Sequence, residues 1–374
     1  MLTAGIVAEF NPFHEGHKYL IQQARERGAT HIVCCMSGAA VQRGELAITD
    51  KHTRAAMAID GGADLVVELP APFSCSSAEF FAKYAVRSLI ELGIDTLAFG
   101  SEYDDKALLY KAAEAALSLP DTDEVRAFLE QGMTYPAAVA AAARKLAGDD
   151  VADLLSSPNS TLAVTYINAL ASAPQVDIMP VKRIGAAHDS DSTEGFPSGM
   201  ELRRRMLSGE LKADFAPIDP TPAEAVIYYG ILTADKPRLM QLPELGAPLA
   251  DRMIKLSAAP PPALEDFLIS VKNKSCTLAR LRRSALHLAI GVEGAADLIP
   301  EPPHIRILAM NSRGREVLSA ADPHIPVSAS LKKLEESSPR AARIIGFENR
   351  AVKLQQICTG CFVNEYTRKF QPQK

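Results

Sequence analysis

The sequence contains no uninterrupted apolar run long enough to cross a membrane, and its first residues lack the charged and apolar regions of a signal peptide. It also lacks an excess of basic residues. The net charge of the 374 residues is -5, so no overall positive field attracts nucleic acid. These absences predict a cytoplasmic protein that does not enter a membrane. Any contact with nucleic acid must come from a local basic patch.

Cysteine is scarce as well, with six residues at irregular spacings, too few for a disulfide framework in a chain of this length. We expect reduced thiols. The pair Cys358 and Cys361 has the C-x-x-C spacing of zinc sites, but no second pair or suitably spaced histidine follows it. Buried or incidental thiols are therefore favoured over a metal site. The six are Cys34, Cys35, Cys75, Cys276, Cys358 and Cys361.

The length of the chain indicates two domains. In residues 1–215, apolar runs that read as strands alternate with helical patterns, which predicts an α/β domain with a Rossmann-like parallel sheet. Residues 216–374 consist mostly of helical patterns separated by proline-rich joints, which predicts a mainly α-helical C-terminal domain. Within it, residues 304–309 read as a short strand. The strands expected in the first domain begin at Gly5 and cover 30–36, 64–69, 96–102 and 176–184.

The expected helix boundaries coincide with residues that commonly begin or interrupt helices. Asp50 is a predicted N-cap, and Pro120 and Pro136 should interrupt the alanine-rich helices of residues 105–146. Residues 185–195 are polar and acidic without periodicity, which predicts a loop. The other expected helices begin at Gly16, cover 77–92 and 162–171, and follow Ser198.

Two histidines stand where the first strand meets the first helix, in the sequence Asn-Pro-Phe-His-Glu-Gly-His of residues 11–17. The first turn of a helix leaves N–H groups unpaired and carries the positive end of the dipole, so it is suited to phosphate. His14 and His17 can reach the same phosphate oxygens, and Gly16 leaves room for a nucleotide against the backbone. A capped, partly buried polar pair without a catalytic role is the alternative.

The densest basic stretch spans residues 272–283. Charge runs usually form a solvated face, and the alternative is a patch for nucleic-acid phosphates. Asn159, beside Pro158, either caps the following helix or faces a ligand. The sequence leaves open whether Glu45, Lys51 and Arg54 contact a substrate or brace the sheet.

These motifs together resemble the bacterial tRNA(Met) cytidine acetate ligase family, within the HIGH nucleotidyltransferase superfamily. The superfamily shares a Rossmann-like fold with class I aminoacyl-tRNA synthetases. The resemblance covers most of the chain and is carried by residues 7–20, 36–38, 42–45, 64–70, 99–102, 158–159, 183–184, 272–283 and 305–314.

The resemblance implies an ATP-dependent ligase. Acetate attacks the α-phosphorus of ATP, pyrophosphate leaves, and the acetyl-adenylate acetylates N4 of the wobble cytidine in elongator tRNA(Met). By motif match, His14 and His17 stabilise the pentacovalent phosphorus, and Arg183 and Arg203 neutralise phosphate charge. Mg²⁺ is expected on the outer phosphates, although only Glu9 and Asp50 are candidate ligands. Ser198 and Arg203 occupy the place of a late superfamily motif, of which only the first serine is present.

The implied binding residues form two groups. The tRNA contacts expected in the basic stretch are Lys272, Lys274, Arg280, Arg282 and Arg283. The residues expected to bind ATP are Val7, Ala8, Glu9, Phe10, Asn11, Pro12, Phe13, His14, Glu15, Gly16, His17, Lys18, Tyr19, Leu20, Gly100, Asn159 and Arg183.

Two other functions share parts of this pattern. An adenylyltransferase acting on a small cofactor precursor would use the same N-terminal site, but it has no need of a long basic helical domain. A nucleotide-binding, tRNA-associated protein without catalysis would not need both imidazoles at the α-phosphate. The oligomeric state is left open.

Overall fold

The computed structural model describes residues 1–184, 196–274, 276–368 and 370. These residues form a seven-stranded sheet in the order β7-β6-β1-β2-β5-β8-β9. The first five strands in that order are parallel, β8 is antiparallel to β5, and β9 is parallel to β8. The strands are β1 (Thr3–Ala8), β2 (His31–Ser37), β5 (Leu65–Leu69), β6 (Thr96–Ser101), β7 (Asp177–Lys182), β8 (Ile305–Met310) and β9 (Val327–Ser328). The α/β fold with a mostly parallel sheet is confirmed.

Both faces of the sheet are covered, which explains why its strands are continuous apolar runs rather than alternating ones. Cys34 belongs to the core on one face, together with Ala55 and Ala58 of α2 (Lys51–Asp60). Its neighbour Cys35 belongs to the core on the other face, together with residues of α4 (Ala78–Glu91) and α9 (Pro158–Ala169). Helix α1 (Glu15–Glu26) shares the face of α2. All six cysteines are free, and four are buried.

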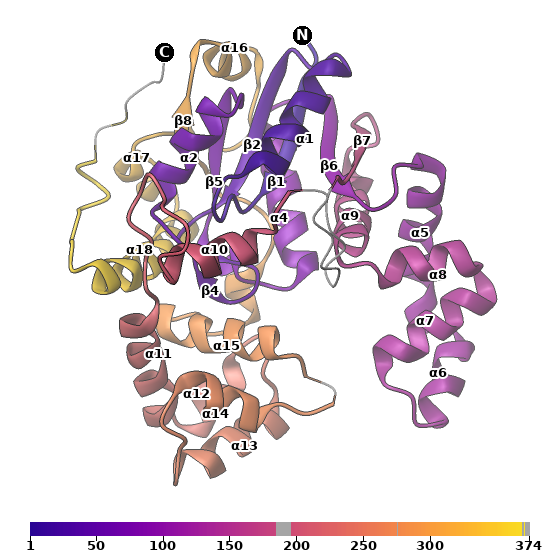
Figure 1. The fold of residues 1–374 in the computed structure, drawn as a ribbon, viewed down its shortest axis with the longest axis vertical. Coiled ribbons are helices and arrows are strands. Elements are labelled where there is room, and N and C mark those ends of the chain that lie inside the picture. Colours follow the sequence, from indigo (N-terminus) through magenta and orange to yellow (C-terminus); the bar gives the residue numbers. More distant parts are fainter. Residues whose placement is uncertain (185–195, 275, 369, 371–374) are drawn as a thin grey trace.

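The segment between β6 and β7 forms an arm of helices beside the sheet, at the right of Figure 1. Its expected interruptions are confirmed, since Pro120 lies in a 3₁₀ turn and Pro136 lies at the start of α7. The arm packs on α9 and so adjoins the end of β6. Its helices are α5 (Lys106–Ser118), α6 (Asp123–Glu130), α7 (Tyr135–Leu146) and α8 (Asp149–Ser156).

A second group of helices lies below the sheet in Figure 1 and has a core of its own. Its apolar residues include Ile227, Leu249 and Phe267, and this core also includes residues of the later helix α18. The helices are α11 (Thr221–Thr233), α12 (Lys236–Gln241), α13 (Ala247–Ser257), α14 (Leu264–Val271) and α15 (Leu278–Ile290), preceded by α10 (Gly199–Leu207).

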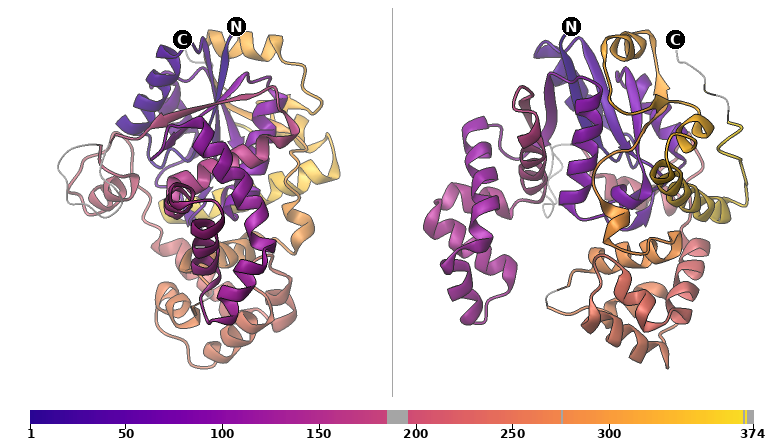
Figure 2. Two further views of the ribbon diagram at one scale, coloured as in Figure 1. Left: turned by 90° about the vertical axis from the view of Figure 1, so that its right-hand side faces the viewer. Right: turned by 180° about the vertical axis from the view of Figure 1, so that it is seen from behind.

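The chain then returns to the sheet. The strand expected at residues 304–309 is β8, which pairs with β5 although about two hundred and forty residues separate Met310 from Leu65. The expected boundary at residue 216 therefore does not separate the strands from the helices, because β8 and β9 belong to the sheet of the first domain. The two views of Figure 2 show this last part of the chain beside the sheet. Its helices are α16 (Ser312–Ala320), α17 (Leu331–Glu335) and α18 (Pro339–Thr359).

A small antiparallel hairpin, β3 (Ala40–Val41) and β4 (Glu45–Leu46), joins the sheet to the helical group. Its turn residue Gly44 has φ +77°, and a Cβ there would lie 2.4 Å from the backbone nitrogen of Arg283 in α15. Glycine is therefore required for this close approach. The short α3 (Ala71–Ser74) follows β5. The loop expected at 185–195 lies outside the described residues. Among the helices that are described, none combines the length and the apolar character needed to span a membrane.

Candidate active site

The loop between β1 and α1 is fixed by packing and by backbone hydrogen bonds. Phe10 is buried, with φ 45°. Phe13 lies over Gly61, where a Cβ would come within 2.2 Å of its ring, so a larger residue at position 61 would displace the ring. The Arg54 guanidinium, fully buried, donates to the carbonyl oxygens of Glu9 (2.8 Å) and Ser37 (2.9 Å) and so joins the ends of β1 and β2. Arg54 thus braces the sheet.

His14 and His17 cap the first turn of α1 with their own ring nitrogens. His14 is the N-cap residue, and its Nδ1 accepts from the Gly16 N–H at 3.1 Å. The Nδ1 of His17 accepts from the His14 N–H at 3.2 Å. The two rings stack with centroids 3.7 Å apart. Because an acceptor Nδ1 carries no proton, each neutral ring has its proton on Nε2. Neither Nε2 has a hydrogen-bond partner within the described part of the chain.

The surroundings keep both rings uncharged. Burial lowers the pKa of His14 to about 4, and the positive charge of Arg183 adds to this effect. The pKa of His17 is also well below the usual value, through burial and the neighbouring His14 and Arg183. At neutral pH the site therefore presents two Nε2–H donors at a helix N-terminus, which is suited to the oxygens of a phosphate. The capping alternative and the phosphate alternative are compatible, since they use different nitrogens.

Arg183 and Arg203 come to the histidines from distant parts of the chain. Arg183 follows β7, and its side chain passes Gly100, where a Cβ would lie 3.4 Å from Arg183 Cγ. Arg203 of α10 donates from Nη1 to the Asn11 carbonyl oxygen at 2.8 Å. A Cβ on Gly199 would lie 3.5 Å from that Nη1 and 3.8 Å from His14 Nε2. Two guanidinium groups thus lie beside the imidazoles.

Ser198 has a structural part in this arrangement. Its side chain caps α10 by accepting from the Glu201 N–H at 3.2 Å, and so fixes the start of the helix that carries Arg203. The following arginine of that helix, Arg204, forms exposed ion pairs with Glu201 and Glu210 at 2.9 Å each. Of these two neighbouring arginines, Arg203 is the one that reaches the histidine loop.

Asn159 lies in the first turn of α9, which begins at Pro158 rather than at Leu162 as the sequence suggested. It does not cap the helix. Its amide donates to Glu102 at 2.7 Å, and Ser160 donates to the other oxygen of Glu102 at 2.6 Å. Burial opposes ionisation of Glu102, but these hydrogen bonds outweigh it and lower the pKa. No local sequence pattern indicates this pairing, because Asn159 lies 57 residues from Glu102.

The carboxylates considered for magnesium are already engaged. Asp50 caps α2, as expected, by accepting from the His52 and Thr53 N–H groups at 3.0 and 3.2 Å. Glu9 accepts from the Gln42 N–H at 2.8 Å, and burial raises its pKa. In the part of the chain that the structure covers, no group of three or more histidine, cysteine or acidic residues is arranged to hold a metal ion.

The basic stretch divides into paired and exposed residues. Arg282 forms ion pairs with Glu265 (2.5 Å) and Glu45 (3.0 Å). Arg283 pairs with Glu244 at 2.5 Å, and Arg280 donates to the Glu244 carbonyl oxygen at 2.6 Å. These three arginines hold α15 against the hairpin and against the residues between α12 and α13. Lys272 and Lys274 are exposed.

Lys51, whose role could not be decided from the sequence, braces the sheet. It is buried, and its Nζ lies 2.5 Å from Glu68 and 2.9 Å from Glu348 of α18. Glu348 also accepts from the N–H groups of Ala39 (2.8 Å) and Ala71 (2.6 Å), so it fixes the segments that follow β2 and β5. Sequence reasoning missed Glu348 because it lies about three hundred residues from its partners.

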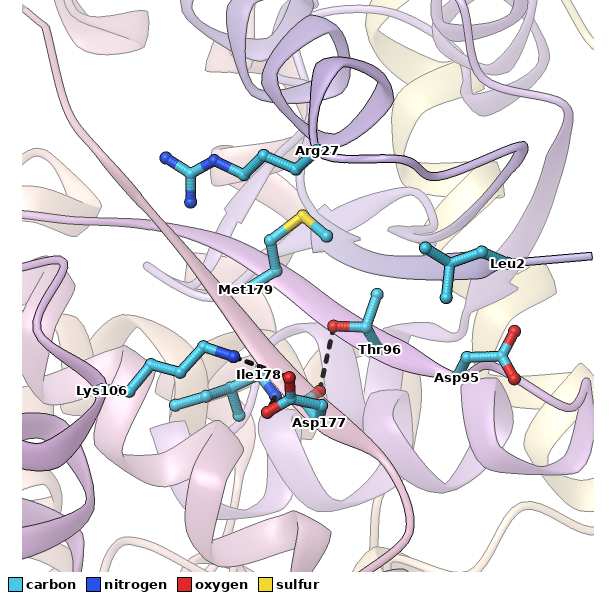
Figure 3. A pocket seen from close by; sticks show the side chains of 8 residues that line it. All are labelled: Leu2, Arg27, Asp95, Thr96, Lys106, Asp177, Ile178 and Met179. Carbon is cyan, nitrogen blue, oxygen red and sulfur yellow. Dashed lines mark hydrogen bonds and ion pairs between the residues drawn. The ribbon is translucent and has the colours of Figure 1, made fainter.

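Two cavities lie outside the histidine loop. One, of about 340 Å³, is at the edge where β6 and β7 begin, and Figure 3 shows Lys106 reaching Asp177 across it. Their side chains are 2.6 Å apart. Ligands of parallel sheets bind at the opposite, carboxyl edge, where the histidines lie. The second cavity, of about 380 Å³, lies between the hairpin, α10 and the helical group.

Comparisons with known proteins show the family to which the chain belongs. A family model described as HIGH Nucleotidyl Transferase matches residues 1–369. The tRNA(Met) cytidine acetate ligase of Caldicellulosiruptor saccharolyticus is 30% identical over an alignment of 384 positions, which covers 96% of this chain and 94% of that protein. The ligase of the same name from Streptococcus mutans is 36% identical over 334 residues, covering 85% and 86%.

Solved structures support the fold over the whole length. The apo crystal structure of Thermotoga maritima TmcAL superposes with a TM-score of 0.87 and 25% identity, covering 100% of both chains. A second structure of that protein, bound with alpha-thio ATP, superposes with a TM-score of 0.85 at 24% identity.

Proposed function

Because the chain belongs to the tRNA(Met) cytidine acetate ligase family of HIGH nucleotidyl transferases, we propose that it activates acetate with ATP and acetylates N4 of the wobble cytidine in elongator tRNA(Met). The observation that carries the proposal is the pair of neutral imidazoles whose Nδ1 atoms are occupied by backbone N–H groups. Their Nε2–H groups are then available to a phosphate. We expect the enzyme to act in the cytoplasm.

In the first step an acetate oxygen attacks the α-phosphorus of ATP, and the bond to pyrophosphate breaks with its electron pair. Negative charge grows on the equatorial oxygens, where His14 and His17 donate hydrogen bonds. Arg183 and Arg203 offset the charge of the phosphates. Such fixed donors act without rearrangement during the reaction, which makes them effective catalysts.

In the second step the N4 amine attacks the carbonyl carbon of the acetyl-adenylate. The new C–N bond forms, the bond from carbon to the phosphate oxygen breaks, and AMP leaves as one amine proton is lost. Mg²⁺ would accompany ATP as part of the substrate and neutralise its outer phosphates. The engagement of Asp50 as a helix cap makes it a poor metal ligand.

For the tRNA, the basic stretch remains the proposed contact. Lys272 and Lys274 are its exposed cations, so they are the side chains we expect to meet backbone phosphates. Arg280, Arg282 and Arg283 support that surface from within through the glutamate contacts described above.

The test is to incubate the purified protein with ATP, Mg²⁺ and labelled acetate, with and without tRNA, and to analyse nucleosides after digestion. Label in N4-acetylcytidine that requires both ATP and tRNA supports the proposal. Acetyl-adenylate without labelled tRNA would indicate another acceptor. Absence of both products would favour an adenylyltransferase for a cofactor precursor, or a binding protein without catalysis.

A further inference from the structure

The 380 Å³ cavity beside the hairpin has the size and lining of a ligand pocket, since such pockets typically span about 300–1,000 Å³ and are mostly apolar. The apolar part of its lining comes from three regions of the chain. Ile48 follows the hairpin, Ile227 belongs to α11, and Leu268 and Leu286 belong to α14 and α15. The pocket thus lies between the sheet domain and the helical group.

Charged groups surround the cavity. Arg282 pairs with Glu45 at 3.0 Å and with Glu265 at 2.5 Å, and Arg203 lies 3.9 Å from Glu45. The side chain of Glu224 also lines the cavity, and it forms no hydrogen bond or ion pair with any described residue, whereas the Glu224 backbone N–H donates to the Pro220 carbonyl oxygen. Burial and the nearby Glu265 raise its pKa. The cavity is lined by three carboxylates and two guanidinium groups, so its charge balance disfavours an anionic ligand. It favours a neutral ligand that carries both hydrogen-bond donors and acceptors.

Asn11 connects this cavity with the histidine site. Its carbonyl oxygen accepts from Arg203 at 2.8 Å, and its side-chain oxygen accepts from the Ile48 N–H at 2.7 Å. Arg203 and Ile48 both line the cavity. The Nη1 atom of Arg203 and the Nε2 atom of His14 lie 3.5 and 3.8 Å from one point, the position that a Cβ on Gly199 would take. A ligand in the cavity therefore lies next to the proposed site of the α-phosphate.

We propose that this cavity receives the cytosine base whose amine accepts the acetyl group, turned out of the RNA stack. The proposal rests on the function proposed above. The apolar walls would contact the faces of the base. The carboxylates would accept from the N4 amine, and a guanidinium group would donate to N3 or O2. Uracil has an oxygen acceptor at position 4, so it could not donate a hydrogen bond to the carboxylates there.

Physical considerations favour this occupant over RNA phosphates. A phosphate would be repelled by the carboxylates and gains nothing from apolar walls. Sequence-specific recognition of RNA generally uses unpaired loop bases, which are turned out at a small free-energy cost and read on their hydrogen-bonding edge. The acceptor must also reach the acetyl-adenylate without displacing ATP, and none of the residues expected to bind ATP lines this cavity.

The first test separates the two half-reactions. In Glu224→Gln, acetate-dependent exchange of pyrophosphate into ATP, measured without tRNA, should proceed as in the wild type. Acetyl transfer to tRNA should fall at least about tenfold in kcat/KM, because a hydrogen bond to a charged group is lost. Ala285→Met, which fills the cavity from α15, should have the same effect, and the exposed Glu130→Gln serves as the control.

The second test uses the wild-type protein, so it does not depend on how the variants fold. An anticodon stem-loop with 5-iodocytidine at the wobble position, which keeps the amine at position 4, is irradiated with the protein and ATP, and cross-linked peptides are identified. Cross-links to the segments that line the cavity, residues 44–48, 203–207, 218–227, 264–268 and 282–286, support the proposal, and cross-links confined to other segments overturn it. Unchanged transfer in both variants, or loss of pyrophosphate exchange in Glu224→Gln, would also overturn it. If the wild type does not acetylate tRNA, the proposed function itself fails.

Discussion

At the scale of single residues, the two ring nitrogens of His17 have separate roles, Nδ1 in the helix cap and Nε2 in the proposed contact with phosphate. A substitution can remove one nitrogen and keep the equivalent of the other. Asparagine places its side-chain oxygen near the position of Nδ1 but has no group at Nε2. His17→Asn should therefore keep the hydrogen bond to the His14 N–H. Its adenylate formation should fall about 10²–10³-fold, as for loss of one transition-state donor in other enzymes.

Pyrophosphate exchange measures this rate, and thermal unfolding checks that the cap is retained. His17→Gln is the matched variant, because its amide nitrogen can reach the Nε2 position, and it should keep more activity than His17→Asn. Equal rates in the two variants would contradict the division of tasks. A strongly lowered melting temperature in His17→Asn would show that the ring is needed for packing against Phe10. The two rings meet edge-on, with their centroids 4.9 Å apart.

The depressed pKa of His14 also predicts how stability depends on pH. In the unfolded chain the imidazole titrates near its ordinary value of 6.5, whereas the pKa in the folded state is about 4. Between these values the unfolded state binds more protons, so the free energy of unfolding falls as the pH is lowered. The loss approaches about 1.4 kcal/mol per pH unit for this histidine.

Urea denaturation at pH 7 and pH 5 measures this effect. His14→Asn removes the titrating group and retains an N-cap side chain, so the free energy of unfolding should decline less between the two pH values than in the wild type. Identical declines would show that the imidazole is not held neutral in the folded protein.

At the scale of elements, the β3–β4 hairpin is positioned by the close approach of Gly44 to α15. In Gly44→Ala the new Cβ would lie 2.4 Å from Arg283 N and 2.6 Å from Arg282 C. These are backbone atoms and cannot rotate away. Gly93 provides a matched control, because its φ of +71° is similar to the +77° of Gly44 and nothing lies within 4 Å of its Cβ position.

Gly93→Ala should therefore lose about 1–2 kcal/mol of unfolding free energy from its positive φ alone. Gly44→Ala should lose about 1–3 kcal/mol more, because of the contact with the backbone. Chemical denaturation of both variants gives the difference. Equal losses would mean that the hairpin moves away from α15 easily.

The elements that could be predicted from the sequence are those with a local signal. The parallel strands are continuous apolar runs, and the caps at Asp50 and Ser198 stand directly before their helices. Pairing between distant segments has no such signal. The short strand at Ile305–Met310 was expected, but nothing near it in the sequence indicated β5 as its neighbour.

The same reasoning applies to the site. The histidine motif could be recognised because its residues are contiguous, whereas the partners of Arg282 depend on three elements that meet only in the fold. Its ion pairs with Glu45 and Glu265 link the hairpin, α14 and α15, whereas contact of Arg282 with RNA stays a prediction. Asn11 was expected to bind ATP, but its contacts with Ile48 and Arg203 could not be foreseen.

At the scale of the whole molecule, the segment that follows α18 is joined to the sheet through a buried ionic cluster. Glu365 pairs with Arg306 of β8 at 2.9 Å and with Lys51 of α2 at 3.5 Å, and His52 lies 3.2 Å away. Glu68 of β5 completes the cluster through Lys51. The side chain of Glu365 is only 7% exposed, so its charge is neutralised by protein rather than by water.

Removing this one charge should therefore destabilise the whole protein. Glu365→Gln leaves Arg306 and Lys51 short of a carboxylate, and loss of one partner of a buried pair costs about 3–5 kcal/mol. Glu336→Gln is the control, because the Glu336 side chain is 65% exposed and its ion pair with the exposed Lys332 is long, at 3.9 Å. It should change the free energy of unfolding by less than about 0.5 kcal/mol.

The sign of the pH dependence gives a further check on the same residue. Burial opposes the charge on Glu365, but the hydrogen bond with His52 and the charges of Lys51 and Arg306 outweigh it and hold its pKa well below the usual range. Its contribution is complete at neutral pH and is lost as the pH falls below the unfolded value, because only the unfolded carboxylate then takes up a proton. The deficit of Glu365→Gln relative to the wild type should therefore be constant from pH 7 to pH 6 and shrink between pH 5 and pH 3 in urea denaturation, because the ordinary carboxyl pKa is 4.5. A deficit that stays constant over this range would mean that Glu365 acts through packing rather than through its charge.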